Sequence, residues 1–244
     1  MAVEIIITKK TKLKNPTLIE GFPGLGLVGT ISASYIVEKL KLEPIGYIKS
    51  ELFPPMAAIH NHIPMHPARV YASSKLNVVI ILSEFVVPIG IVQELAESIF
   101  AYAKSIGVKK ILSLGGITIK GEQDTVYAIA SNMDLVNKVS KYKTVKMIKE
   151  GATTGVTGVL LARGADEGFD VVSLLAEAQP EYMDPRAASM VIEVVNQMLG
   201  LKIETDSLDQ EAKMIESKMR EVMNRAKASQ THYKKAESLG PMYG

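Results

Sequence analysis

The sequence predicts an α/β protein in which helices cover both faces of a mostly parallel β-sheet, forming a three-layer α/β/α sandwich. Residues 1–200 alternate short apolar runs with helical patterns, which is typical of strands and helices that follow one another along a parallel sheet. Hydrophobic residues make up 47% of the 244 positions, enough for a packed globular core. After Gly200 the composition changes, which predicts a long C-terminal helix and an extended tail.

Eight short apolar runs are the predicted strands of this sheet. They occupy residues 3–7, 17–20, 45–49, 70–73, 78–82, 110–114, 126–130 and 170–175.

Two helices have clear boundaries in the sequence. Residues 93–105 carry apolar side chains at helical spacing and are followed by Gly107. Residues 185–199 follow Asp184 as the N-cap and begin with Pro185, which suits the first helical position. A third helix is expected after a glycine-rich segment and ends near residue 40.

The segment 207–235 contains neither Gly nor Pro, which predicts a separate helix of roughly 28 residues and about 40 Å. Leu208, Ile215 and Val222 share one heptad position, and Met219 lies at the other. Because this apolar stripe is narrow, we expect the helix to pair with another subunit or to project from the body. Packing back on the core of its own chain is the alternative. The predicted organisation is a core domain at 1–203, a helical extension at 204–239 and a tail at 240–244.

The charges of the chain are nearly balanced. Lys and Arg number 28 against 26 Asp and Glu, so no strong uniform field favours nucleic acid or an anionic membrane. No apolar run reaches the roughly 18 residues of a membrane span, and the first residues show no leader pattern. Cysteine is absent, which excludes disulfides and thiolate sites. We therefore expect a cytoplasmic protein without nucleic-acid or membrane partners.

Residues 24–29 read Gly-Leu-Gly-Leu-Val-Gly and match the G-x-G-x-x-G pattern of dinucleotide-binding turns. Glu51 is only a loose candidate for the acidic residue that would hold a ribose, and the Lys-Ser/Thr ending of a P-loop is absent. A turn that lets a helix pack closely on a strand explains the glycines without a ligand. We predict such a structural turn, in which Gly24→Ala or Gly26→Ala lowers stability. Its glycines are Gly21, Gly24, Gly26 and Gly29.

The sequence offers no complete catalytic or metal-binding set. His60, His62 and His66 are close enough in sequence to share a metal, but no adjoining carboxylate completes the set and nearby prolines indicate a turn-rich connection. The remaining histidine, His232, lies in the predicted C-terminal helix, and no G-x-S-x-G elbow is present. We predict a protein that is not an enzyme, with no cofactor and no functional metal.

The segment 151–158, Gly-Ala-Thr-Thr-Gly-Val-Thr-Gly, is the basis of an alternative function. Small residues before a helix leave backbone N–H groups free to bind a phosphate, although helix capping explains the same residues. The alternative is an enzyme or sensor that binds a small phosphate- or nucleotide-like ligand at the glycine-rich loops.

Four segments together resemble the family of proteasome assembly chaperone 2 proteins and their archaeal homologues. They are Glu20-Gly21-Phe22-Pro23-Gly24-Leu25-Gly26-Leu27-Val28-Gly29, Leu114-Gly115-Gly116, the glycine-punctuated stretch 155–161, and Asp184-Pro185-Arg186-Ala187-Ala188. The resemblance covers about residues 18–199. It implies a three-layer α/β/α domain akin to nucleoside phosphorylases and peptidyl hydrolases but without their catalytic residues, and it implies that the glycine turn is structural.

The last three residues, Met242-Tyr243-Gly244, are similar to the hydrophobic-Tyr-any-residue motif by which proteasome activators dock on the α ring of the core particle. Gly240 and Pro241 end the predicted helix before them. The resemblance implies an ATP-independent assembly chaperone or activator of the proteasome. We expect a homo-oligomer of four or five subunits; the sequence leaves the choice between chaperone and activator open.

Overall fold

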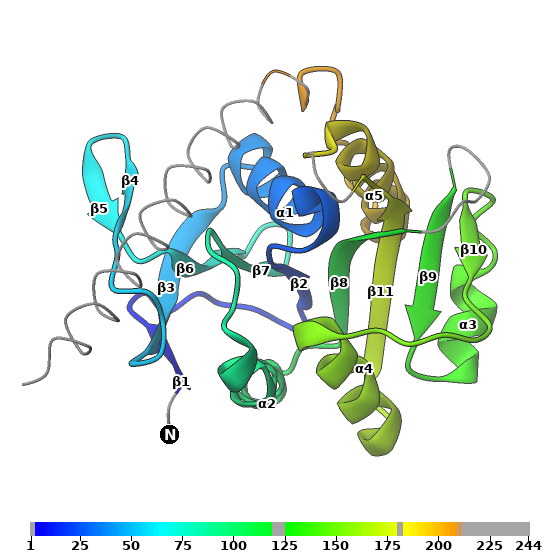
Figure 1. Ribbon diagram of the computed structural model, residues 1–244, viewed down its shortest axis with the longest axis horizontal. Coiled ribbons are helices and arrows are strands. Elements are labelled where there is room, and N and C mark those ends of the chain that lie inside the picture. Colours follow the sequence, from blue (N-terminus) through cyan, green and yellow to red (C-terminus); the bar gives the residue numbers. More distant parts are fainter. Residues whose placement is uncertain (1–2, 119–124, 180–182, 209, 211–244) are drawn as a thin grey trace, which may run out of the picture.

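A nine-stranded sheet forms the middle layer of the protein (Figure 1). The structure is a computed structural model that describes residues 3–118, 125–179, 183–208 and 210. The strands of the sheet are β1 (Val3–Ile7), β2 (Thr17–Gly21), β3 (Glu43–Ser50), β6 (Ala68–Ser73), β7 (Val78–Ser83), β8 (Lys110–Ile117), β9 (Val126–Ala130), β10 (Val145–Met147) and β11 (Asp170–Glu177). Their spatial order is β1-β3-β6-β7-β2-β8-β11-β9-β10.

The sheet is mixed, with as many antiparallel as parallel pairings. Strands β7, β2, β8 and β11 pair in parallel through the centre, as do β9 and β10 at one edge. The pairs β1/β3, β3/β6, β6/β7 and β9/β11 are antiparallel. A short connection such as residues 74–77 between β6 and β7 permits only an antiparallel neighbour, whereas parallel strands need a longer crossover. The predicted α/β class is thus confirmed, and the share of parallel strands is smaller than expected.

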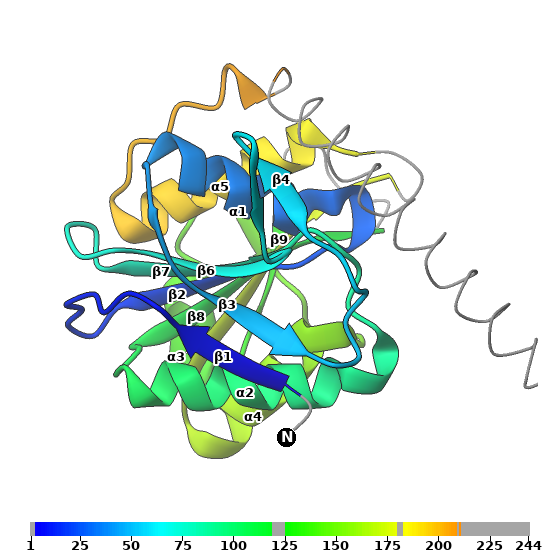
Figure 2. The same cartoon turned by 90° about the vertical axis from the view of Figure 1, so that its left-hand side faces the viewer.

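Helices cover both faces of the sheet, as Figures 1 and 2 show. Helices α1 (Val28–Lys39) and α5 (Pro185–Leu199) pack on one face, and α2 (Val92–Ser105) and α4 (Gly155–Glu167) pack on the other. The short α3 (Met133–Val139) contacts β9 and β10. Side chains alternate between the two layers along each strand, so Leu18 faces α2 and α4 while Ile19 faces α1 and α5.

Helix α5 begins and ends at the predicted residues because both of its ends are capped. The Asp184 carboxylate accepts a hydrogen bond from the Ala187 N–H at 2.9 Å, and Pro185 fills the first helical position. Gly200 adopts a left-handed conformation after the last turn.

A two-stranded hairpin, β4 (Ala58–His60) and β5 (Ile63–Met65), projects beside the main sheet where the sequence predicted an irregular connection. Asn61 and His62 form its two-residue turn with φ values of 49° and 69°. Positive φ at both positions is the geometry that joins tightly paired antiparallel strands. His60, His62 and Pro64 interrupt the apolar pattern of these residues, so the sequence did not indicate the two strands.

Residues 203–208 pack on the α1 and α5 layer. Leu208 is 1% exposed and belongs to the hydrophobic core, and the Tyr35 hydroxyl donates to the Glu204 carbonyl at 2.7 Å. Leu208 is therefore buried within its own chain and is not exposed for the predicted contact between helices. The other predicted seam residues, Ile215, Met219 and Val222, lie outside the described residues.

Candidate functional site

The glycine-rich turn after β2 is filled by its own neighbours. A Cβ at Gly21 would lie 2.4 Å from the Ala33 Cβ, and one at Gly29 would lie 2.3 Å from the Leu114 carbonyl oxygen. A Cβ at Gly116 would likewise meet the Leu25 carbonyl oxygen at 2.4 Å. Such distances are far below van der Waals contact, so these glycines allow the start of α1 to approach β2 and β8.

Gly24 and Gly26 differ within the same turn. Gly26 has a φ of 60°, and a Cβ there would lie 2.7 Å from the Ala178 Cβ. A Cβ at Gly24 would meet nothing within 4 Å. The expected loss of stability on substitution by alanine therefore has a steric basis at Gly26 and none at Gly24.

A buried polar cluster lies beneath this turn. Glu20, at the end of β2, is 2% exposed; it accepts hydrogen bonds from the Ser113 hydroxyl at 2.5 Å and the Phe22 N–H at 3.2 Å. The Thr157 hydroxyl in the first turn of α4 lies 2.7 Å from the Ser113 hydroxyl. Ser173 lies beside Ser113 in register, and its hydroxyl has no partner in the part of the chain that the structure describes.

Burial raises the pKa of Glu20 to about 7, and the hydrogen bonds from Ser113, Phe22 and Thr157 oppose this rise only in part. A carboxyl with this pKa has the proton affinity of a candidate general acid. The carboxyl is buried, however, and its oxygens accept hydrogen bonds from Ser113 and the Phe22 N–H. The cluster therefore has the chemistry of an internal polar contact between the sheet and α4.

Residues 151–154 lead into α4, and residues 155–158 form its first turn. Thr154 is the N-cap residue, without a side-chain capping bond, and Thr157 contributes to the polar cluster. A Cβ at Gly158 would lie 2.7 Å from the Thr153 carbonyl oxygen. The close approach of the loop to the helix explains this glycine without a phosphate.

A second buried carboxyl, that of Glu84, follows β7 next to the hairpin. The Arg69 guanidinium forms an ion pair with Glu84 and donates to the Tyr71 hydroxyl at 2.6 Å and the His66 carbonyl at 2.9 Å. His60 Nε2 lies 2.8 Å from Glu84 Oε1, although its N–H direction falls outside hydrogen-bond geometry. Burial alone would raise the pKa of Glu84, but the contact with His60 and the charge of Arg69 lower it below its usual value.

The three clustered histidines have separate environments. His60 contacts Glu84, His62 occupies the hairpin turn, and the His66 ring stacks on Tyr47 with centroids 3.7 Å apart. Within residues 3–118, 125–179, 183–208 and 210, no group of three or more metal-ligating side chains is placed to hold an ion. No helix in these ranges is both long and apolar enough to cross a bilayer.

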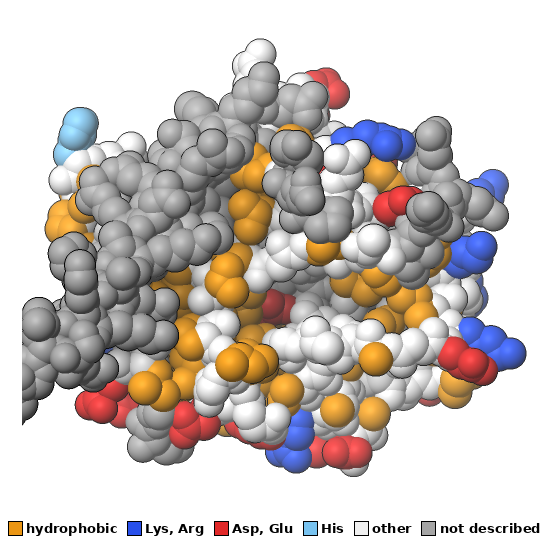
Figure 3. All heavy atoms as spheres, in the orientation of Figure 1, with side chains coloured by type: hydrophobic (Ala, Val, Ile, Leu, Met, Phe, Trp, Pro, Cys, Tyr) orange, Lys and Arg blue, Asp and Glu red, His pale blue; other side chains and the backbone are white. Residues whose placement is uncertain are grey.

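Exposed apolar side chains gather around the hairpin and the adjacent loops. The Phe53 and Phe85 rings, 4.7 Å apart, join the loop after β3 to the loop after β7, and the contact of His60 with Glu84 joins both to the hairpin. Figure 3 shows hydrophobic side chains across this view of the molecule and a hollow near its centre. We use the name hairpin face for the exposed apolar residues of the hairpin and the adjacent loops: Leu52, Ile59, Ile63, Val86 and Ile89. The strand pairing places Ile59 and Ile63 on opposite sides of the hairpin.

Sequence reasoning missed Arg69, Glu84 and the hairpin face. Arg69 interrupts an otherwise apolar buried strand, and a charged residue at such a position requires a buried partner. This charged residue in a buried strand was the sequence signal from which a buried ion pair could have been predicted. The predicted docking residues Met242, Tyr243 and Gly244 lie outside the described part of the chain.

Comparisons with known proteins give one consistent result. A model of the PAC2 family matches residues 18–223. An uncharacterized protein of Methanocaldococcus jannaschii is 33% identical over 221 residues, which cover 91% of each chain.

Two solved structures from Pyrococcus furiosus are similar over nearly their whole length. PbaA, described as an archaeal homolog of proteasome-assembly chaperone, has a TM-score of 0.80 at 32% identity, covering 99% of this chain and 100% of its own. PbaB, described as an archaeal proteasome activator, has a TM-score of 0.76 at 27% identity, covering 91% of this chain and 98% of its own.

Proposed function

Because this chain belongs to the PAC2 family, we propose that it is a proteasome-interacting scaffold that forms a homo-oligomer and docks on the α ring of the core particle. The observation that carries this proposal is the likeness to both PbaA and PbaB along almost the entire chain. One of these relatives is described as a chaperone homolog and the other as an activator. The proposed role accordingly covers assembly or activation of the proteasome, in the cytoplasm.

The proposed docking element is the tripeptide Met242-Tyr243-Gly244. In this arrangement the Gly244 carboxylate pairs with a basic residue of the α ring, the Tyr243 ring fills a pocket, and Met242 packs in an apolar notch. Terminal carboxylates and single aromatic anchors are recurrent features of peptide recognition. Several tails on one oligomer would bind together, which raises a weak single-tail affinity by orders of magnitude.

The proposed activity needs neither ATP nor a catalytic residue. Support comes from the two positions that resembled ligand sites. Gly21, Gly26 and Gly29 of the glycine turn are closely packed by backbone and side-chain atoms, and in the segment 151–158 a Cβ at Gly158 would lie 2.7 Å from the Thr153 carbonyl oxygen. The alternative function, a phosphate- or nucleotide-binding enzyme or sensor, gains no support from these contacts.

Two parts of the chain are proposed to hold the oligomer of four or five subunits together. The first is the helical seam of Ile215, Met219 and Val222. The second is the hairpin face, because apolar side chains that protrude in water mark contact surfaces. Ile59 and Ile63, on opposite sides of the hairpin, are 57% and 63% exposed. Light scattering of the purified protein measures the subunit number, and a monomer at micromolar concentration would contradict this assembly.

The function is tested with purified core particles and two variants of the tail. Deletion of residues 242–244 should abolish capture of core particles and any stimulation of peptide hydrolysis, with oligomeric mass and melting temperature unchanged. One residue added after Gly244 should act almost as badly, because it moves the carboxylate. Stimulated hydrolysis indicates an activator, whereas faster assembly of core-particle subunits without stimulation indicates a chaperone. Equal capture of the truncated and full-length proteins would refute tail docking.

A further inference from the structure

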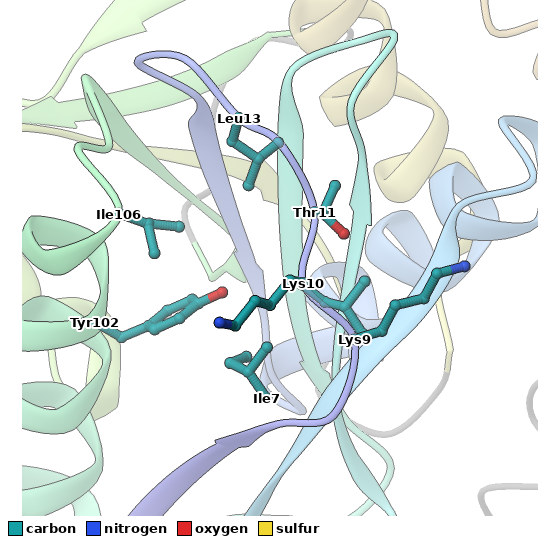
Figure 4. A pocket seen from close by; sticks show the side chains of 8 residues that line it. Ile7, Lys9, Lys10, Thr11, Leu13, Tyr102 and Ile106 are labelled. Atoms are coloured by element: carbon teal, nitrogen blue, oxygen red, sulfur yellow. The ribbon is translucent and has the colours of Figure 1, made fainter.

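A cavity of about 320 Å³ lies at the opposite end of β2 from the glycine turn (Figure 4). It opens between the loop that follows β1 and the C-terminal end of α2. This volume is at the lower end of the range for small-molecule pockets. Its lining includes no residue of the hairpin face or of the buried Glu20 cluster.

The rim of this cavity presents hydrogen-bond donors. Figure 4 shows the side chains of Lys10 and Tyr102 pointing toward one another, while Lys9 points away. Lys9 is paired with Glu43. No carboxylate among the described residues pairs with Lys10, and no described group accepts from the Tyr102 hydroxyl. Thr11 adds a second hydroxyl.

Two backbone carbonyls at the end of α2 already accept hydrogen bonds from groups other than Lys10, Thr11 and Tyr102. The Tyr102 carbonyl accepts from the Ser105 hydroxyl at 2.8 Å and the Ile106 N–H at 3.2 Å, and the Ala103 carbonyl accepts from the Val108 N–H at 2.8 Å. These two carbonyls at the end of α2 are thus already hydrogen-bonded. Burial raises the pKa of Tyr102, so its phenol keeps the proton that it can donate.

The walls and floor of the cavity are apolar. Ile7, Leu13, Ile45 and Ile106 line it, and Ile7 is 37% exposed. Lys12 and Lys14 on the same loop are not part of this lining. An uncompensated ammonium and two hydroxyls above an apolar floor suit a ligand with one anionic group and a short apolar body.

We propose that this cavity binds a small organic carboxylate, with the carboxylate at Lys10 and Tyr102 and the hydrocarbon against Ile7, Leu13 and Ile106. A carboxylate fits better than a phosphate because the site holds one unpaired ammonium, enough for a single negative charge. The same chemistry is present in a free short-chain acid and in the carboxyl terminus of a peptide that ends in an apolar residue.

Isothermal titration calorimetry of the intact protein tests the proposal with butyrate, hexanoate and hexanol. Each added methylene should tighten binding about 4-fold until the floor is covered. Hexanoate should bind at least about 5-fold more tightly than hexanol, because the alcohol lacks the charge. A peptide with an apolar last residue, compared with its C-terminal amide, distinguishes the two sources of the carboxylate.

Two variants and one control locate the site. Lys10→Met removes the ammonium and should weaken hexanoate binding about 5-fold, and Tyr102→Phe removes only the hydroxyl and should weaken it about 3-fold. Lys12→Met, an equal loss of charge on the same loop but outside the cavity, should change binding less than about 2-fold. The proposal is overturned if no carboxylate binds at about 10 mM, if hexanol binds as well as hexanoate, or if Lys12→Met and Lys10→Met weaken binding equally.

Discussion

The glycine turn and the hairpin each adjoin a buried glutamate, and they accommodate its charge in opposite ways. Below the turn, Glu20 has hydroxyl and N–H neighbours, and burial raises its pKa to about 7. Below the hairpin, Glu84 contacts Arg69 and His60, and its pKa is lowered. The Glu20 carboxyl is neutral below about pH 7 and is buried, whereas the Glu84 carboxyl is charged and contacts the hairpin through His60. Gly21, Gly26 and Gly29 of the ligand-like motif are thus closely packed, whereas the hairpin exposes apolar side chains that we propose as a contact surface.

The largest effect is expected from breaking the ion pair below the hairpin. Arg69→Met leaves the Glu84 carboxylate buried without its guanidinium and should lower the free energy of unfolding by about 3 to 5 kcal/mol. Urea denaturation measures the loss. Adding Glu84→Gln to this variant should recover part of it, since the unpaired charge is then absent. Strictly additive losses would show that the two side chains do not depend on each other.

Gly29→Ala should destabilise the protein by about 3 kcal/mol or prevent folding, because the new Cβ meets backbone oxygens of Leu114 and Phe22 that cannot move independently. Gly24→Ala is the matched control and should change the free energy of unfolding by less than about 0.5 kcal/mol. The same denaturation experiment compares them. Equal losses at the two positions would mean that close packing does not explain the turn.

Glu20→Gln should make stability less dependent on pH. Because the folded-state pKa of Glu20 is raised from 4.5 to about 7, its favourable contribution is full below about pH 4.5 and is lost as pH rises through 7. The amide cannot ionise, so above pH 7 the variant should be more stable than the wild type by about 2 to 3 kcal/mol. Thermal unfolding between pH 4 and pH 8 measures the difference. Glu84→Gln should instead destabilise the protein at neutral pH, where the native carboxylate is charged.

Substitutions on the hairpin face should affect assembly and leave folding almost unchanged. Ile59→Ser combined with Ile63→Ser should alter the free energy of unfolding within a monomer by less than about 0.5 kcal/mol per residue, because both side chains are exposed. The oligomeric mass measured by light scattering should fall. Met133→Ser removes an equally exposed apolar side chain far from the hairpin and should leave the mass unchanged. An unaltered mass in the double variant would exclude the hairpin face from subunit contacts.

Local sequence signals predicted most of the regular elements. All eight expected strands are present, and β1, β9 and α5 have the predicted bounds, because apolar alternation and caps such as Asp184 act over a few residues. The strands and helices that were not predicted are β4, β5, β10 and α3, each of seven residues or fewer, and α4 was expected only as a helix without bounds after the segment 151–158. A segment of seven residues or fewer carries too few positions to show a period. Asn132, which caps α3 by accepting from the Leu135 N–H at 2.9 Å, was an overlooked signal.

The site was less predictable than the fold because its contacts are distant in sequence. Ser113 reaches Glu20 across 93 positions, and the partners of Arg69 depend on how β6, β7 and the hairpin meet. The close approach of the glycines at 21 and 29 to their neighbours likewise follows from the packed layers. The structural interpretation of the turn came from a missing acidic partner, and the packing supplies its physical reason.

The central claim, that the α/β body holds the fold while the tail engages the proteasome, is tested most directly by surface plasmon resonance on immobilised core particles. Tyr243→Ala should lower the affinity by at least about 30-fold per tail, with unchanged melting temperature and oligomeric mass, since a buried aromatic anchor commonly carries about 2 kcal/mol or more. Gly24→Ala, a substitution in the body that meets no neighbour, should bind like the wild type. Equal binding of Tyr243→Ala and wild-type protein would contradict the account and assign the contact to the body.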